Sequence, residues 1–324
     1  MRQRRGRSRL WTWLGFGAVS LIVAAGPAGA SAQQPAGIEA NVENGAIAFA
    51  RSPAESPLRM IYRMSRDGDN LLQLTDADTL DFSPAWSNDG EQLAFSRLNE
   101  MGMVNIFTIG PRGGTLTQVT TSGANDDEAN VAATWRPNNR WIAFTRGPFV
   151  GEGAPGIFRQ RLDGKGLKQL TASPDGDTNP AWSPRGGRIL FTRSTASEEA
   201  AIWSVKHDGT GERRLTDDRK GTDNAHWSPD GRWIVFNRAR GNGSAIFKMR
   251  ANGGSLERLT KGGQVDANPV FSPNGKRIAF DRAPNQNSSS ASIFKMRANG
   301  SRKQRLTVGA ANDIEPSWRG RLSR

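Results

Sequence analysis

The sequence predicts an all-β fold, a six-bladed β-propeller, because three features each recur six times along most of the chain. An aromatic residue opens each copy, at Trp86, Trp135, Trp182, Trp227, Phe271 and Trp318. An apolar-x-Phe-x-Arg segment ends at Arg51, Arg97, Arg146, Arg193, Arg238 and Arg282. A threonine closes each copy, at Thr75, Thr120, Thr171, Thr216, Thr260 and Thr307. Successive threonines are 44 to 51 residues apart, which is the length of a four-stranded blade.

The copy over residues 225–260 shows the elements in order. A first strand ends at AHW, and the turn SPDG leads to a second strand, RWIVFNR. A third strand, AIFKMR, is followed by the turn ANGG and a short fourth strand that ends at LT. Asp-Gly and Asn-Gly suit tight turns that need positive φ. We therefore expect the tight turns on one face of the propeller, and the longer and more variable loops on the other.

The two ends of the repeated region complement each other. The first copy begins at its second strand, GAIAFAR (45–51), and the C-terminus supplies a spare first strand, IEPSW (314–318). Pairing of these segments would close the ring and remove two open sheet edges. We therefore expect residues 45–320 to form the propeller, with a short linker over 33–44 before it and a tail over 321–324.

Residues 1–32 have the pattern of a secretory signal peptide. A basic segment, MRQRRGRSR, precedes an apolar run, LWTWLGFGAVSLIVAAG, and an Ala-x-Ala site at residues 30–32. The alternative is an uncleaved anchor, since this run could just span a bilayer. No later segment is apolar enough to cross a membrane. The sequence thus predicts an exported protein, periplasmic or extracellular and associated with the cell envelope.

The composition excludes several kinds of site. The chain has no cysteine, so it has no disulfide, thiolate nucleophile or cysteine-bound metal. It has two histidines, too few to favour a histidine-based metal site. No nucleic-acid motif is present despite a net charge of +13. We expect a monomer with no catalytic residues, no certain cofactor and no nucleic-acid partner.

The repeated unit, P-x-W-S-P-D/N-G…I-x-F-x-R…I-F…G…L-T, resembles the TolB-type, WD40-like propeller repeat, and the resemblance covers roughly residues 45–320. It implies a six-bladed propeller that binds a protein or peptide partner in the envelope, with Ca²⁺ as an option in the channel. Full TolB proteins carry an α/β domain ahead of the propeller. Here only residues 33–44 separate the predicted signal peptide from the first repeat.

The face with the variable loops gathers acidic residues at the predicted channel mouth. The candidate binding residues are Asp81, Asp177, Asp223, His226, Asp266, Asp313 and Glu315. Carboxylates in a ring could hold a cation or a basic peptide, and carboxylates are suitable Ca²⁺ ligands. The alternative is that each carboxylate pairs with the repeated arginine of its own or a neighbouring blade. We assign no metal ligand.

Two departures from the repeat are further candidates. Phe149 lies in the long loop GPFVGEGAPG (147–156), where an exposed aromatic could anchor a partner. His226 replaces the small residues that precede the aromatic in other copies. With Asp223 it could serve as acid and base in an alternative function, that of a propeller lyase or hydrolase acting at the channel mouth.

Overall fold

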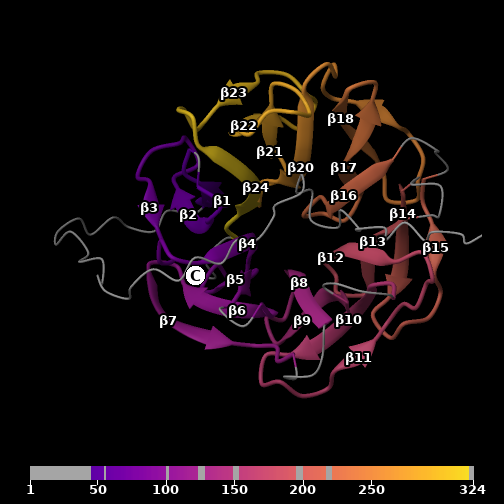
Figure 1. The fold of residues 1–324 in the computed structure, drawn as a ribbon. Helices are drawn as coiled ribbons and strands as arrows, with labels where there is room; N and C mark the ends of the chain where they lie inside the picture. Colours follow the sequence, from indigo (N-terminus) through magenta and orange to yellow (C-terminus); the bar gives the residue numbers. More distant parts are fainter. Residues whose placement is uncertain are drawn as a thin grey trace, which may run out of the picture. The chain divides into compact units, whose positions relative to one another are not determined.

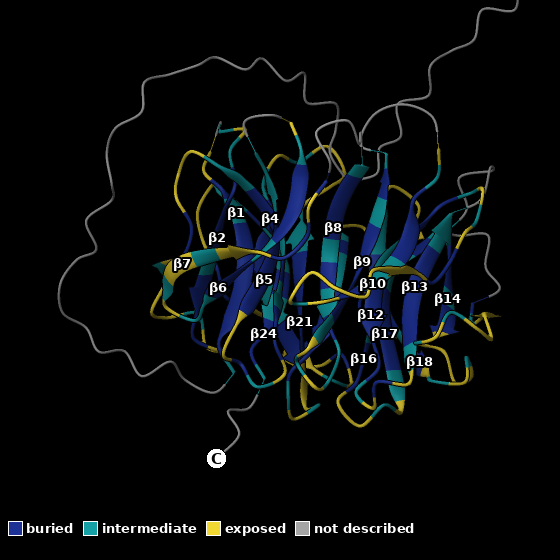
Figure 2. Ribbon diagram, turned by 90° about the horizontal axis from the view of Figure 1, so that it is seen from below, coloured by how far each residue is buried: buried dark blue, intermediate teal, exposed yellow. Residues whose placement is uncertain are grey.

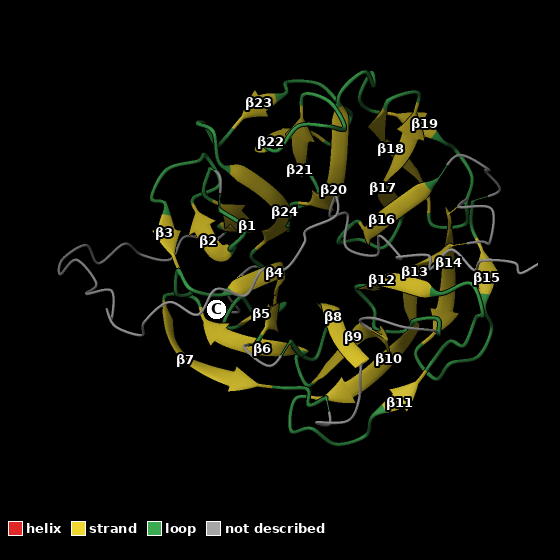
Figure 3. Cartoon of the chain, viewed as in Figure 1, coloured by secondary structure: helices red, strands yellow, loops and turns green. Residues whose placement is uncertain are grey.

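A computed structural model describes residues 45–54, 56–99, 102–122, 128–148, 153–194, 200–216 and 221–320. These residues lie in one compact unit, Glu39–Arg324. They form 24 β-strands and no helix, and Figure 3 shows only strands and loops. The all-β propeller is therefore confirmed.

Four repeats form separate four-stranded sheets. Repeat one consists of β24 (Asn312–Trp318), β1 (Ile47–Ser52), β2 (Met60–Met64) and β3 (Leu72–Gln73). Repeat two consists of β4 (Leu80–Trp86), β5 (Leu93–Leu98), β6 (Val104–Gly110) and β7 (Gly113–Gln118). Repeat three consists of β8 (Glu128–Trp135), β9 (Trp141–Pro148), β10 (Gly156–Arg161) and β11 (Lys168–Gln169). Repeat four consists of β12 (Asp177–Trp182), β13 (Arg188–Ser194), β14 (Ala200–Lys206) and β15 (Arg213–Arg214).

The last two repeats share one eight-stranded sheet. Repeat five consists of β16 (Thr222–Trp227), β17 (Trp233–Arg240), β18 (Gly243–Arg250) and β19 (Glu257–Arg258). Repeat six consists of β20 (Val265–Phe271), β21 (Arg277–Ala283), β22 (Ser292–Arg297) and β23 (Gln304–Arg305).

This shared sheet corrects the predicted number of blades. The prediction of six blades was wrong, because only four sheets are separate four-stranded blades and the others are joined through β18 and β20. Ser244 of β18 pairs in parallel with Val265 of β20, and the amide of Ser244 donates to the carbonyl of Gln264 at 3.0 Å. Gly243 permits this approach, since a Cβ there would lie 2.4 Å from the Gln264 oxygen.

The ring closes through pairing of the first and last strands (Figure 1). β1 and β24 are antiparallel neighbours, with Ile47 opposite Trp318 and Arg51 opposite Asp313. The innermost strands β24, β4, β8, β12, β16 and β20 contact one another in that order around the ring. Figure 1 shows them facing the centre, with the outer strands at the rim.

The hydrophobic core lies between neighbouring sheets. Its centre is the phenylalanine of the repeated apolar-x-Phe-x-Arg strand, fully buried at Phe49, Phe95, Phe144, Phe191, Phe236 and Phe280. Figure 2 shows buried strands through the middle of the unit and exposed residues at the turns and on outer strands such as β7. Each buried aromatic contributes roughly 1.5–3 kcal/mol.

The closing threonine explains how a two-residue fourth strand stays attached. In every repeat its hydroxyl accepts a hydrogen bond from the backbone N–H of the isoleucine in the third strand, at 2.9 to 3.0 Å. All six threonines are buried. The side chain thus supplies an acceptor where the ladder ends, so that a buried N–H is not left unpaired.

Several predictions fall on residues outside the described ranges. These are the signal peptide (1–32), the linker (33–44), the tail (321–324) and the loop residue Phe149. Among the residues that the structure does describe, no helix is long and apolar enough to cross a membrane.

Candidate functional site

Four of the predicted mouth carboxylates form buried ion pairs with the repeated arginine of the same repeat. Each aspartate lies on an innermost strand, and each arginine lies opposite it on the next strand. Nε and Nη2 of the arginine donate to the two carboxylate oxygens, at 2.6 and 2.9 Å for Arg51–Asp313, 2.7 and 2.7 Å for Arg97–Asp81, 2.6 and 2.8 Å for Arg193–Asp177, and 2.5 and 2.9 Å for Arg282–Asp266. Such bidentate arginine–carboxylate pairs are strong and directional.

The arginines also lie over aromatic rings. The guanidinium of Arg193 lies 5.2 Å from the ring centre of Phe191 and 4.6 Å from that of Trp203. Arg51 lies in the same way over Phe49 and Tyr62. The hydrogen bond to Asp313 raises the pKa of Arg51, against the effect of burial. These four carboxylates are thus neutralised inside the protein, as the pairing alternative expected.

Two repeats depart from this arrangement. In repeat three, Arg146 pairs with Glu128, and Asn130 occupies the aspartate position. In repeat five, Thr222 occupies it. The neighbouring Asp223 accepts hydrogen bonds through Oδ1 from Asn179 at 2.9 Å, from Thr192 at 2.7 Å and from the amide of Asn224 at 2.7 Å.

Each innermost strand contains a bulge whose central residue has positive φ, at Ser83, Ala132, Asn179, Asn224, Asn268 and Glu315. In repeats three and four the bulge amide takes its acceptor from the preceding repeat: Ser96 Oγ accepts from Ala132 at 3.1 Å, and Thr145 Oγ1 accepts from Asn179 at 3.1 Å. Repeat one has Ala50 at the position of Ser96, and an alanine side chain cannot accept. Instead, the Glu315 carboxylate accepts from the amide of Ser83 at 2.6 Å.

Repeat six has a carboxyl, Asp281, at the same capping position. Its Oδ1 accepts from Asn268 Nδ2 at 2.7 Å and from the amide of Glu315 at 3.0 Å. Burial raises the pKa of Asp281 to about 7, and the charges of Glu315 and Asp266 add to this, although the two hydrogen bonds act in the opposite direction. Asp281 is therefore close to half-protonated near neutral pH.

Arg59 completes this group. Burial lowers its pKa, while the nearby charges of Glu315 and Asp281 raise it. We call Arg59, Ser83, Asn268, Asp281 and Glu315 the mouth cluster. Its members come from repeats one, two and six, so the cluster exists only because the ring closes. Three of them lie on innermost strands, which face the centre in Figure 1.

The comparisons with known proteins agree with the propeller fold. The family model of the TolB beta propeller domain matches residues 70–222 and 178–320. This chain belongs to the TolB β-propeller family. It is 30% identical over 136 residues to a TolB homolog of Chlorobium luteolum (42% of this chain, 29% of the relative) and 35% identical over 109 residues to the Tol-Pal system protein TolB of Gluconobacter oxydans (32% and 22%).

Among solved structures, TolB from Acinetobacter baumannii has a TM-score of 0.73 at 22% identity, covering 86% of this chain and 67% of that one. At this identity the likeness shows the fold alone. The matched segments span less than a third of the length of the two curated relatives.

The remaining predicted residue, His226, lies at a junction between repeats in this TolB-family propeller. Its equivalents Thr134 and Ser317 accept from the backbone N–H of the aromatic in the next repeat, each at 3.1 Å. His226 Nδ1 lies 3.0 Å from the carbonyl oxygen of Trp227, to which Nδ1–H donates. Burial lowers the pKa of His226, which keeps the ring neutral at pH 7. No hydrogen bond joins it to Asp223, whose described contacts are given above, so the suggested acid–base pair is not assembled.

Within the described ranges, no group of three or more acidic or histidine side chains is arranged to hold a metal ion. The ion pairs explain this for Asp81, Asp177, Asp266 and Asp313, because their oxygens already accept from arginine. Ca²⁺ in the channel stays an untested expectation.

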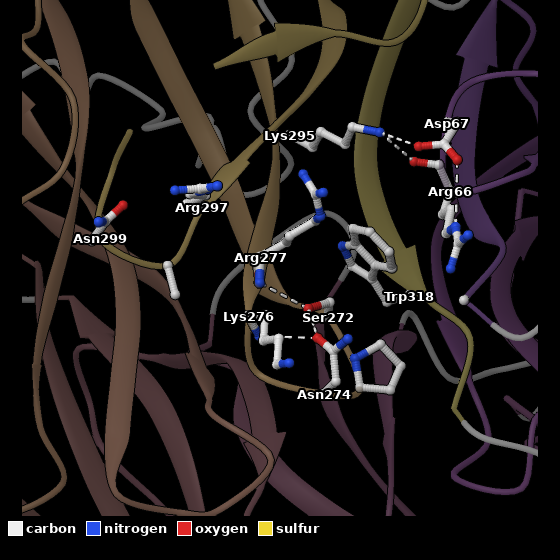
Figure 4. A pocket seen from close by; sticks show the side chains of 13 residues that line it. Arg66, Asp67, Ser272, Asn274, Lys276, Arg277, Lys295, Arg297, Asn299 and Trp318 are labelled. Atoms are coloured by element: carbon white, nitrogen blue, oxygen red, sulfur yellow. Dashed lines mark hydrogen bonds and ion pairs between the residues drawn. The ribbon is translucent and has the colours of Figure 1, made fainter. Parts of the chain in front are cut away.

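The opposite face of the TolB-family ring, which carries the tight turns, has a basic cavity of about 890 Å³ between repeats six and one (Figure 4). Its lining includes Lys276, Arg277, Lys295 and Arg297 from repeat six. The Nζ of Lys295 donates to Asp67 of repeat one at 2.6 Å and to the carbonyl of Arg66 at 3.0 Å.

Sequence reasoning found Glu315 but missed its partners Arg59, Ser83, Asn268 and Asp281. One signal was available: the residue after the central phenylalanine is Ala50, Ser96, Thr145, Thr192 and Asn237 in the other repeats, and only repeat six has a carboxyl there. Arg59 lies in a loop outside the repeated pattern, and no sequence signal marks it.

Proposed function

We propose that this TolB-family propeller is a non-catalytic binding protein that recognises a protein or peptide partner through the mouth cluster. The observation that carries the proposal is the asymmetry of that cluster. Most polar groups of the ring recur from repeat to repeat and bind one another, whereas Asp281, Glu315 and Arg59 occur once and lie together. A unique polar group on a repeated scaffold is a suitable place for specific recognition.

A basic segment of the partner fits this site best. Glu315 forms no ion pair with a described arginine or lysine, unlike the four aspartates held by arginines, although the charge of Arg59 lies near it. The name of the Gluconobacter oxydans relative places that protein in the Tol–Pal system. Together with the predicted signal peptide, this supports an envelope protein as the partner of the present chain.

Site-specific crosslinking tests the proposal. A photo-crosslinking residue replaces Asp78, exposed beside the start of β4, and in a matched protein it replaces Lys165, exposed in a tight turn on the opposite face. We expect one discrete adduct from envelope extracts with the Asp78 protein alone. Unlabelled wild-type protein should compete for that adduct, and a Glu315→Gln competitor should do so several-fold less well, because it loses the charge but keeps an acceptor for Ser83. Equal adducts from both positions, or equal competition by both proteins, would refute the proposal.

A further inference from the structure

Arg63 on β2 is a buried arginine without a counter-ion. The residue is 5% exposed, and no hydrogen bond, ion pair or ring contact to its side chain is found among the described residues. Its Nε is enclosed without an acceptor. A buried charge is costly unless it is paired and hydrogen-bonded. This position therefore needs an anion that the described chain does not supply.

The side chain points into the junction between repeats one and two. Side chains two residues apart share one face of a strand, so Arg63 lies on the same face of β2 as Ile61. Ile61 packs in one cluster with Trp86 and Ile109 of repeat two. The Nε1–H of Trp86 also lacks an acceptor among the described residues, and Trp86 is 7% exposed.

Two more arginines flank this junction. Arg319, which follows β24, donates from Nε to the carbonyl of Gly90 at 2.7 Å and lies 5.5 Å from the ring centre of Trp86. Gly90 leaves room for this, since a Cβ there would lie 2.8 Å from Arg319 Nε. Arg112 is exposed in the turn between β6 and β7. The charges of Arg319 and Arg112, after burial, lower the pKa of Arg63.

The junction between repeats six and one contains a counter-ion that the junction between repeats one and two does not. Lys295 occupies in repeat six the position of Arg63 in repeat one, and its Nζ donates to Asp67 of the next repeat (Figure 4). Tyr62 pairs with Gln73, and Phe107 pairs with Gln118, so the two turns have equal length. Counted from these pairs, Arg112 occupies the position of Asp67. The carboxylate that neutralises Lys295 is thus replaced by a third cation beside Arg63.

The remaining junctions differ from that of Arg63. Thr108 and Ser204 occupy the position in repeats two and four and carry no charge. Lys248 pairs with Glu257 at 3.0 Å and lies over Trp233. The Nε of Arg159 also lacks an acceptor among the described residues, but Arg159 is only partly buried and lies 4.9 Å from the ring centre of Trp141.

The acids near the three arginines do not change this balance. The charges of Asp89 and Glu91 raise the pKa of Arg319. Neither acid is among the charges that shift the pKa of Arg63. The Asp89 carboxylate already accepts from the Ser87 hydroxyl at 2.6 Å and from Asn139 Nδ2 at 2.7 Å.

We propose that Arg63, Arg112 and Arg319 form a binding site for an oxyanion, a phosphate or a carboxylate, between repeats one and two on the tight-turn face. Arg63 supplies buried N–H donors, and Trp86 adds an indole donor. Arginine suits this task because its planar donors match the oxygens of both groups. The site is separate from the mouth cluster and does not depend on the partner proposed there.

The test is thermal unfolding of the purified protein in sodium phosphate and in sodium chloride at equal ionic strength, which separates binding from screening. We expect the midpoint of wild-type protein to rise with the logarithm of phosphate concentration. Arg112→Asp rebuilds the carboxylate seen at Asp67. This variant should have a higher midpoint without phosphate and should bind phosphate at least about tenfold more weakly by calorimetric titration.

Asp67→Asn is the matched control, because it removes the counter-ion of Lys295 and leaves Arg63 untouched; its phosphate response should be no smaller than that of wild type. If Arg112→Asp does not fold, Arg112→Ala tests the same loss of affinity. Sodium acetate distinguishes a carboxylate ligand from a phosphate ligand. If the unfolding midpoint rises with acetate as well as with phosphate, the site accepts carboxylates. If the midpoint rises with phosphate alone, the ligand is a phosphate. An equal response of wild type and Arg112→Asp, or no response beyond chloride in either anion, overturns the proposal.

Discussion

At the scale of single residues, the same repeated position performs different tasks in different repeats. The residue after the central phenylalanine accepts a hydrogen bond from the next bulge when it is Ser96 or Thr145. Asp281 does the same in repeat six, but it brings a carboxyl into a buried setting. The cost of burying its charge raises its pKa to about 7. One substitution in the repeat thus converts a neutral cap into a group that titrates near physiological pH.

Asp281 makes the stability of the fold depend on pH. The folded protein keeps the proton up to about pH 7, whereas the unfolded chain releases it near the ordinary value of 3.8. The folded state therefore binds more protons between these values, and the free energy of unfolding falls as pH rises through this window. Asp281→Asn should remove this dependence and raise the unfolding midpoint at pH 8 relative to wild type, with a smaller difference at pH 5.

Thermal unfolding from pH 5 to pH 8 checks this expectation. Asp78→Asn is the control, because Asp78 is exposed, and its curve should follow that of wild type. A wild-type midpoint that rises from pH 5 to pH 8 as steeply as that of Asp281→Asn would contradict the assignment.

At the scale of elements, β24 has the greatest effect on the ring. It supplies the innermost strand of repeat one from the far end of the chain. It also carries Glu315, which caps Ser83, and Ser317, whose hydroxyl accepts from the amide of Trp86 at 3.1 Å. The amide of Glu315 also donates to Asp281 of repeat six at 3.0 Å, so the strand contacts both of its neighbouring repeats.

Removal of residues 312–324 should prevent cooperative folding, because it leaves β1 with an open edge and takes the caps from repeat two. We expect a large fall in the unfolding midpoint and an increase in light scattering. Removal of residues 321–324 alone is the control and should leave both unchanged. Cooperative unfolding of the shorter chain at the wild-type midpoint would show that the pairing of β1 with β24 does not hold the ring.

At the scale of the whole molecule, the distribution of charge differs from what the count of acids suggests. The sequence predicts a gathering of acidic residues at one face of the ring, but four of these aspartates face arginines at 2.5 to 2.7 Å. Buried pairs of this kind fix geometry more surely than they add stability. The tight-turn face carries Arg63, which has no counter-ion among the described residues, and the basic cavity lined by Lys276, Arg277 and Arg297.

This distribution predicts that Ca²⁺ does not stabilise the protein. Unfolding midpoints measured with CaCl₂ and with a chelator at equal ionic strength should agree, because arginines occupy the carboxylates that would ligate the ion. A ligand at about 100 times its dissociation constant would add roughly 2.7 kcal/mol, which such a measurement resolves. A rise in midpoint specific to Ca²⁺ would instead indicate that carboxylates other than these four aspartates ligate the ion.

The sequence alone was sufficient to predict the propeller and the pairing of its first and last strands. Both follow from a local pattern, repeated often enough that each strand and turn could be assigned without knowledge of its neighbours. The alternative that aspartates pair with the repeated arginines also came from that pattern, since partners in one repeat are 16 residues apart in Arg97–Asp81 and Arg193–Asp177.

Tertiary structure decided the features that depend on contacts between repeats. The joining of repeats five and six rests on Gly243 and Gln264, and no repeated motif marks that approach. The contact between Ser83 and Glu315 spans 232 residues and forms only in the closed ring. The isolation of Arg63 likewise depends on which side chain the next repeat places opposite it. A local pattern specifies each blade, whereas the chemistry of a junction depends on two segments that only the folded ring brings together.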